Sequence, residues 1–189
     1  ASAVDFLCNF SRNTRGIVLN NSKLTGGINR LAAQDLVHSS RLVLELNVDK
    51  GLEANNSEVK LDGVLDIHGN GKGAVVKNSL LELDHLNVHH NQHRGLHLVG
   101  SDFRYNKNKY AGNYTRTAYD FRRNLTTASL TKHAALYSPI SVRNNSNATF
   151  LQTRIRQTSE DIPGSFEAQY GAAIEVRDNS KAKFQGTGT

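Results

Sequence analysis

The segment from Arg104 to His133 mixes positive charge with aromatic rings, a combination that could bind an anionic ligand. It contains seven basic side chains but a single acid, Asp120. Guanidinium groups clamp carboxylates and phosphates, while tyrosine rings offer flat faces on which sugars or bases can stack. The alternative is a solvated loop whose rings pack on the scaffold. The candidate ligand-binding residues here are Arg104, Tyr105, Lys107, Lys109, Tyr110, Tyr114, Arg116, Tyr119, Arg122 and Arg123.

A second set of cations precedes four glycines at regular intervals. These residues are Arg15, Lys50, Lys72 and Arg94. If the segments that contain them stack as parallel strands, the cations form a column with a spacing of roughly 5 Å. Such a column would favour a linear polyanion laid along the stack. In the alternative interpretation the cations point into solvent or pair with Glu45, Asp49 or Asp66.

Histidines gather in one part of the chain, and imidazole can bind a metal or sense pH. Five of them are His85, His89, His90, His93 and His97, and His68 precedes His90 by 22 positions. Stacked imidazoles could hold a transition metal or become charged together below about pH 6.5. The spacing matches no closed zinc motif. The sequence therefore favours surface histidines, with His68 and His90 as the weaker metal candidates and no metal or cofactor predicted.

Asp62 and Asp84 are separated by the same 22 positions, and Asn106 follows at the next interval. Paired carboxylates can act as the acid and base of glycoside cleavage, or hold Ca²⁺. Each Asp directly follows an apolar Leu, which predicts a turn that faces solvent. No Arg or Lys base accompanies them at a recognisable spacing. Binding is therefore favoured over catalysis, and these two residues are only weak catalytic candidates.

An internal repeat must position all of these side chains. Residues 51–72 match residues 73–94 without a gap, so that Asn56 falls on Asn78 and Ser57 on Ser79. Six units share this corner, at Ser22, Ser57, Ser79, Ser101, Ser146 and Ser180. Apolar alternation on both sides of each corner predicts two short strands joined by a bend. Asn suits the bend because it tolerates the left-handed region.

Units of this length must stack to bury their apolar faces, which predicts an all-β, right-handed parallel β-helix. Asn56 and Asn78 are expected to form a buried amide ladder. A helical solenoid is disfavoured because no unit holds ten residues of helical periodicity. Residues 1–189 form one domain with insertions near Asn29–Ser40 and over 104–139, and a bulge precedes the last two corners. Because the sequence shows no polar cap, we expect a piece of a longer stack.

The glycine-apolar unit starts, the Asn-Ser corners and the 22-residue unit resemble the pectin-lyase-like parallel β-helix superfamily. Within it, the sequence is most similar to passenger domains of bacterial autotransporter and polymorphic outer-membrane adhesins. An FxxN pattern shared with the latter occurs at 6–9, 103–106 and 121–124, whereas 171–174 is a poor copy of their GGA motif. The resemblance implies the fold. It leaves function open, because the superfamily includes lyases, hydrolases, phage tailspikes and adhesins.

Composition narrows the class of partner. The net charge of the 189-residue chain is +6 and its pI is about 9.5, which favours anionic partners. One cysteine excludes an internal disulfide, and no apolar run approaches the ~20 residues that span a membrane. We therefore expect a secreted or surface-displayed bacterial adhesin module that binds an acidic glycan. The alternatives are a polysaccharide lyase or glycoside hydrolase, including the tailspike type, and a structural stalk; nucleic acid is disfavoured by the fold.

Overall fold

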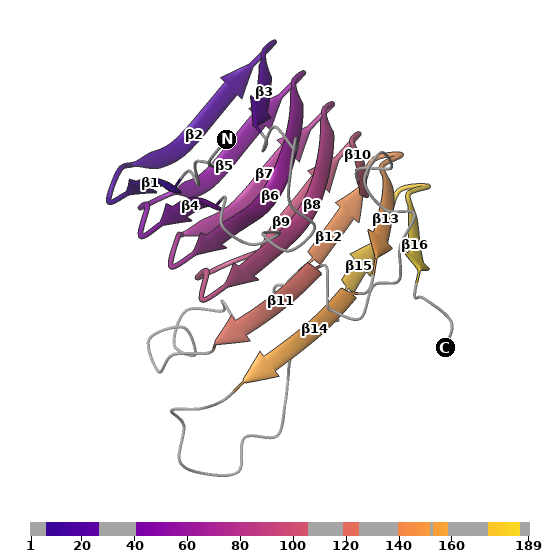
Figure 1. Cartoon of the computed structure of the whole chain (residues 1–189). Helices are drawn as coiled ribbons and strands as arrows, with labels where there is room; N and C mark the ends of the chain where they lie inside the picture. The colour runs from indigo at the N-terminus through magenta and orange to yellow at the C-terminus, as the bar shows by residue number, and fades with distance from the viewer. Residues whose placement is uncertain are drawn as a thin grey trace, which may run out of the picture.

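The computed structural model describes residues 7–26, 41–105, 119–124, 140–151, 153–158 and 174–185. Every regular element in these ranges is a β-strand (Figure 1). The strands are β1 (Leu7–Ser11), β2 (Arg15–Asn20), β3 (Lys23–Gly26), β4 (Arg41–Glu45), β5 (Lys50–Asn55), β6 (Glu58–His68), β7 (Lys72–Lys77), β8 (Leu80–His89), β9 (Leu96–Val99), β10 (Asp102–Tyr105), β11 (Tyr119–Asn124), β12 (Ile140–Arg143), β13 (Asn147–Leu151), β14 (Thr153–Thr158), β15 (Ile174–Val176) and β16 (Lys181–Gln185). No helix long and apolar enough to cross a membrane occurs in these ranges.

The strands form two parallel sheets in which successive units lie side by side in chain order. The six-stranded sheet has the order β15-β12-β9-β7-β5-β2, and the larger sheet follows the path β1-β4-β6-β8-β10-β13-β16, with β3, β11 and β14 beside it. Leu52 pairs with Ala74 and Ala74 with Leu96, so the predicted 22-residue register is confirmed. Figure 1 shows this progression from indigo β2 to yellow β15.

Two strands of the larger sheet are long enough to take part in two successive stretches of pairing. The first halves of β6 and β8 pair with β3 and β10, and their second halves pair with β4 and β11. Between the halves of β6 the register shifts by one residue, after Leu61 and before Val64. The second half of β6 therefore pairs with β8 at an interval of 21 residues instead of 22.

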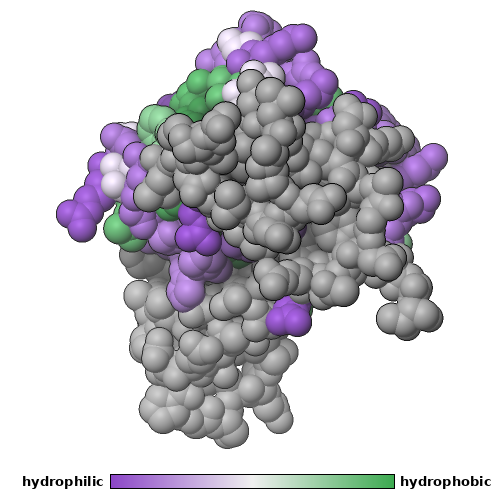
Figure 2. Space-filling view, viewed as in Figure 1, coloured by the Kyte–Doolittle hydropathy of each residue, from purple (hydrophilic) through white to green (hydrophobic). Residues whose placement is uncertain are grey.

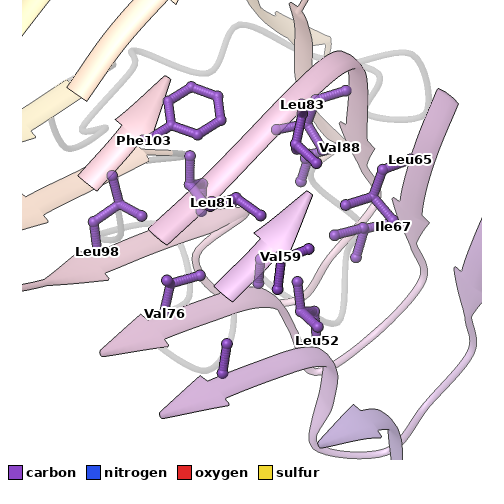
Figure 3. Packing of buried hydrophobic residues seen from close by; sticks show 14 of the residues in the cluster. Leu52, Val59, Leu65, Ile67, Val76, Leu81, Leu83, Val88, Leu98 and Phe103 are labelled. Atoms are coloured by element: carbon purple, nitrogen blue, oxygen red, sulfur yellow. The ribbon is translucent and has the colours of Figure 1, made fainter. Parts of the chain in front are cut away.

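Apolar side chains fill the space between the sheets (Figure 3). Strand alternation supplies them: Leu65 and Ile67 point inward from β6, while Asp66 and His68 lie on its other face. Successive units place equivalent side chains in contact, as with the rings of Phe103 and Phe150, whose centroids are 5.1 Å apart. On the side shown in Figure 2, the described residues are mainly hydrophilic.

The repeated corner residues adopt the left-handed backbone that the sequence predicts. Asn21, Asn56, Asn78 and Gly100 all have positive φ, between 48° and 58°. Asn56 and Asn78 are nevertheless exposed, so the prediction of a buried amide ladder through them is wrong. A left-handed residue at a tight corner turns its side chain outward, and the following serine carries the buried hydrogen bonds instead.

The serines that follow these corners form a hydroxyl ladder along the stack. The backbone N–H of each serine donates to the Oγ atom of the serine in the next unit, over 2.9–3.1 Å. The ladder consists of Ser22, Ser57, Ser79, Ser101, Ser146 and Ser180. Ser79, Ser101 and Ser146 are 7%, 2% and 0% exposed, so these bonds are made away from water.

An asparagine ladder does exist, but at the corner that precedes each unit-opening glycine. The Oδ1 atom of Asn70 accepts hydrogen bonds from the backbone N–H and the side-chain amide of Asn47, both over 2.9 Å. Asn91 does the same for Asn70, over 3.0 and 3.1 Å. The backbone N–H of Asn13 donates to Asn47 in turn. Asn47, Asn70 and Asn91 are almost completely buried.

The structure also bears on the predicted bulge before the last two corners and on the predicted insertions. The additional residue before the last two corners appears as a pair of left-handed residues, Asn144–Asn145 and Asp178–Asn179. The prediction that 104–139 leaves the stack as one loop is wrong for Tyr119–Asn124, because β11 pairs in parallel with β8 and β14. Alternating apolar residues let this stretch continue the sheet. The other predicted insertion, at Asn29–Ser40, lies outside the described residues.

Candidate ligand-binding site

The cations before the unit-opening glycines occupy matching positions at the start of the strands in the six-stranded sheet. Arg15 pairs with Lys50, and Lys50 pairs with Lys72. The carbonyl of Arg94 then accepts a hydrogen bond from Gly73 on β7, which places Arg94 in the next unit of the column. The predicted juxtaposition of these four residues is therefore present.

The glycines beside the column are required by close packing. A Cβ atom on Gly51 would lie 2.6 Å from Cγ2 of Ile67 and 3.0 Å from Nδ2 of Asn70. On Gly73 it would lie 2.1 Å from the carbonyl oxygen of Gly95. Each strand thus starts in direct contact with its neighbours, which fixes where the cation before it emerges.

A hollow of about 540 Å³ opens next to the column, and we call it the basic hollow. It is lined by Lys50, Lys72, Val75, Lys77, His93, Arg94 and His97. Four of these residues are permanently charged cations and none is a carboxylate. Within the described ranges Lys77 makes no ion pair, and it is exposed. The hollow therefore presents positive charge with part of it uncompensated.

Carboxylates just outside the lining neutralise one end of the column. The Nζ atom of Lys50 lies 2.9 Å from Asp49 and 3.2 Å from Glu53. Glu53 also accepts a 3.1 Å hydrogen bond from Arg15, and Lys72 lies 3.7 Å from Asp49. The alternative in which Asp49 pairs with the column is thus present, and Glu53 is a partner that the sequence analysis missed.

These contacts fix the charge states of the pair at the centre of the column. Hydrogen bonding to Lys50 holds the pKa of Asp49 below its ordinary value, although partial burial opposes the shift. Burial alone would lower the pKa of Lys50, but hydrogen bonds to Asp49 and Glu53 outweigh it and raise that pKa. Both groups are therefore ionised at neutral pH. Lys72 has only the longer 3.7 Å contact to Asp49, and Lys77 has no ion pair within the described ranges.

A second compensated group lies at the other side of the hollow, around Glu175 on β15. Its Oε2 atom lies 2.6 Å from Arg143 and 3.5 Å from Arg94, and Oε1 lies 2.8 Å from Arg177. Burial would raise the pKa of Glu175, but the hydrogen bond from Arg143 and the surrounding arginines lower it. One carboxylate thus serves three guanidinium groups, so positive charge remains in excess here as well.

His97 lies between the two groups, on β9, opposite Val75 on one side and Ser141 on the other. Burial, together with the nearby charges of Arg94, Arg143 and Lys77, lowers the pKa of His97 to about 4. The ring is therefore neutral at physiological pH. His97 therefore does not follow the alternative in which the histidines become charged together below about pH 6.5.

The lowered pKa of His97 predicts how the stability of the protein depends on pH. The folded pKa of His97 lies below the unfolded value, so the unfolded chain binds a proton first as pH falls. We expect His97 to cost about 1 kcal/mol of unfolding free energy between pH 7 and pH 5, discounted for partial exposure of the ring. Urea unfolding of wild type and His97→Gln measures the difference. An identical pH dependence for the two proteins would contradict the assignment.

The structure describes only some of the other candidate residues, those of the basic segment from Arg104 to His133. Arg104 lies on β10 and pairs with Glu82 over 2.9 Å, so its charge is already compensated. Only the backbone is described for Tyr105 on β10 and for Tyr119, Arg122 and Arg123 on β11. Lys107, Lys109, Tyr110, Tyr114 and Arg116 lie outside the described residues. Binding by this segment stays a prediction.

Of the two weak catalytic candidates, the structure describes the side chain of Asp84 alone. Asp84 is 3% exposed, and its Oδ2 atom accepts a 3.3 Å hydrogen bond from the backbone N–H of Gly63. The expected solvent-facing turn is therefore wrong for Asp84, because the register shift in β6 gives this carboxylate a backbone group to bind. The side chain of Asp62 and all of Asn106 lie outside what is described.

The histidine pairing is also corrected. His68 pairs with His89 rather than His90, because the shift in β6 shortens the interval to 21 residues. His90 instead occupies a left-handed corner with φ 55°. The basic hollow is lined by His97, on β9 of the other sheet, and by His93 in the turn before that strand. The apparent cluster therefore divides into two groups on different sheets.

Sequence reasoning missed Glu53, Lys77, His97 and Glu175 as members of this site. A signal was present, because Glu53, Val75, His97, Ser141 and Glu175 occupy one row across five paired strands. Reading outward-facing positions across the repeat would have placed them together.

Comparison with known proteins adds no relative. No family model, no curated protein and no solved structure matches the chain. The site is therefore interpreted from its own chemistry.

Proposed function

We propose that the chain is a right-handed parallel β-helix of the pectin-lyase-like type that binds an acidic glycan at the basic hollow. The fold proposal rests on two parallel sheets that both follow chain order with one repeating register. The binding proposal extends to a secreted or surface-displayed adhesin module, for which the resemblance in sequence is the only support.

The observation that carries the binding proposal is the lining of the hollow. Lys50, Lys72 and Arg94 follow one another across adjacent strands, about 4.8 Å apart per step, with Lys77 on the same strand as Lys72. A row of cations in a concave surface without lining carboxylates attracts a chain of anions better than an isolated ion. A uronate or sulfated polysaccharide supplies anionic groups in such a repeating order.

Removing the two least compensated cations tests the proposal. We expect Lys72→Ala with Lys77→Ala to weaken binding to heparin or polygalacturonate at least about tenfold, roughly 1.4 kcal/mol. Wild-type binding should fall steeply with added salt, because exposed charges are screened over about 8–10 Å. Titration calorimetry at two salt concentrations, with neutral dextran as a negative control, measures both effects.

The matched control removes the same charge elsewhere. Lys181→Ala with Lys183→Ala changes two exposed lysines on β16 of the other sheet and should leave affinity within about twofold. The site would instead lie in the predicted basic segment if neutralising Arg116, Arg122 and Arg123 lowers the affinity while the substitutions at Lys72 and Lys77 do not change it. Shortened polymer after incubation would favour a lyase or hydrolase instead.

A further inference from the structure

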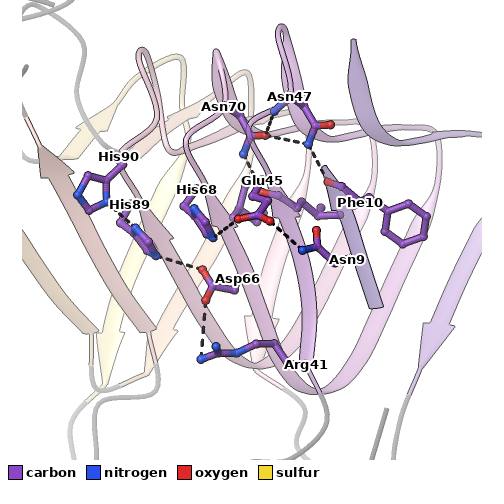
Figure 4. Close-up of polar contacts among 12 residues, drawn as sticks. Asn9, Phe10, Arg41, Glu45, Asn47, Asp66, His68, Asn70, His89 and His90 are labelled. Carbon is purple, nitrogen blue, oxygen red and sulfur yellow. Dashed lines mark hydrogen bonds and ion pairs between the residues drawn. The ribbon is translucent and has the colours of Figure 1, made fainter. Parts of the chain in front are cut away.

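Asp66, His68 and His89 form a compact group of metal-ligating side chains on the larger sheet, apart from the basic hollow. One ligand atom from each lies within 4.8 Å of the others. Asp66 is nearly buried, and the side chains of His68 and His89 are 25% and 27% exposed. The group is therefore accessible to an ion but largely shielded from bulk water (Figure 4).

The fold holds these three residues on one face. Leu65 and Ile67 are buried in the core, so the alternation of β6 places Asp66 and His68 on the opposite side. The register shift in β6 then sets His68 beside His89, with ring centroids 4.6 Å apart and planes inclined by only 5°. The two imidazoles thus lie side by side on adjacent strands.

Carboxylates stand next to both imidazoles. Nε2 of His89 lies 3.2 Å from Oδ1 of Asp66, and Nε2 of His68 lies 3.4 Å from Oε2 of Glu45. Glu45 is oriented by a 2.8 Å hydrogen bond from Asn9. Figure 4 shows Asp66 between His89 and Arg41, whose NH2 atom lies 3.8 Å from Oδ2 of Asp66.

We infer that Asp66, His68 and His89 bind one divalent transition-metal ion, with Glu45 as the fourth protein ligand. Imidazole nitrogen and carboxylate oxygen are the ligands that Zn²⁺ and Co²⁺ take in proteins. Tetrahedral coordination at about 2.0–2.1 Å brings ligand atoms to roughly 3.3 Å from one another. Because an imidazole binds a metal in the plane of its ring, His68 and His89 must turn about their side-chain torsions out of the parallel stack to share one ion.

The position of His90, next to His89 in the chain, supports metal binding by His89. Nδ1 of His89 and Nδ1 of His90 are 2.6 Å apart, a contact that requires a proton on one of the two nitrogens. When a metal occupies Nε2 of His89, the proton of that ring resides on Nδ1 and is donated to His90. Metal-binding histidines characteristically donate their second nitrogen in this way, which fixes the ring and its tautomer.

Co²⁺ titration followed by visible absorption tests the inference on the full chain. All proteins carry Cys8→Ser, because Cys8 is an exposed thiol that could itself bind metal. We expect one Co²⁺ per chain, with the strong absorption of a tetrahedral site, and displacement by Zn²⁺. His68→Gln and His89→Gln should each weaken binding at least about tenfold, while the control His93→Gln, in the basic hollow, should change it by less than about twofold.

Stability supplies an independent readout. Zn²⁺ should raise the melting temperature of the parent protein, because an ion that binds only the folded chain stabilises it. The melting temperatures of His68→Gln and His89→Gln should not change when Zn²⁺ is added. Urea unfolding checks that each variant folds, and either variant alone suffices for the comparison. The inference is overturned if no Co²⁺ binds below about 1 mM. It is equally overturned if binding persists unchanged in both variants.

Discussion

Replacing Asn70 with leucine is expected to lower the free energy of unfolding by about 4 kcal/mol. Asn70 is fully buried, and its side chain bonds Asn47 on one side and Asn91 on the other. Leucine has a similar size but strands the backbone N–H of Asn47 and the carbonyl of Leu44, which the amide of Asn70 satisfies over 2.9 Å. Each buried group left unbonded costs about 1–3 kcal/mol.

Urea unfolding measures this loss, and Asn78→Gly provides the matched control. Asn78 is exposed with φ 48°, a conformation that glycine adopts freely, so its replacement should change stability by less than about 0.5 kcal/mol. Equal effects at Asn70 and Asn78 would show that the buried ladder contributes nothing beyond the corner itself.

Gly73→Ala is expected to cost about 3 kcal/mol or more, although it adds a single methyl group. That methyl would lie 2.1 Å from the carbonyl oxygen and 2.9 Å from the carbonyl carbon of Gly95, both backbone atoms of the next strand. The carbonyl of Gly95 accepts a 2.7 Å hydrogen bond from the backbone N–H of Ala74, so it cannot move away without losing that bond, and overpacking here reaches the upper end of its usual cost. Thermal or urea unfolding measures it.

Gly26→Ala separates this effect from the general consequence of replacing glycine in a strand. A Cβ atom on Gly26 meets only Cδ2 of Leu61, at 3.1 Å, and that flexible side chain can give way. We expect a change of about 1 kcal/mol or less. A Gly73 variant as stable as the Gly26 variant would mean that the strands are spaced more loosely than the structure has them.

The order of the strands could be predicted from the sequence because the repeat is carried by buried positions. Val59, Leu81 and Phe103 recur at 22-residue intervals, and burial forces such positions into register. The choice of ladder residue was not predicted, since Asn56 and Asn78 match conspicuously while Asn47, Asn70 and Asn91 recur at unequal intervals of 23 and 21. Only their constant place shortly before the unit-opening glycine marks them.

The candidate site likewise includes residues that could be predicted from the sequence and residues that could not. Column residues Arg15, Lys50 and Lys72 follow from the repeat alone, since they precede glycines. The pairing of His68 with His89 could not be foreseen, because it depends on a one-residue shift inside β6. Glu53 and Glu175 share no motif with the column, and reading the outward-facing positions across the repeat is what would place them in one row beside it.

The two ladders also determine where the length of the chain can vary. The serine ladder passes through all six corners, where the connection between strands differs by a single residue. The last described step of the asparagine ladder is Asn91, and the connections before β12 and β15 then lengthen to residues 125–139 and 159–173. The stretches 27–40 and 106–118 follow β3 and β10, at the corner that neither ladder crosses. Additional sequence thus occurs at two of the three corners, whereas the corner of the serine ladder keeps an almost constant length from unit to unit.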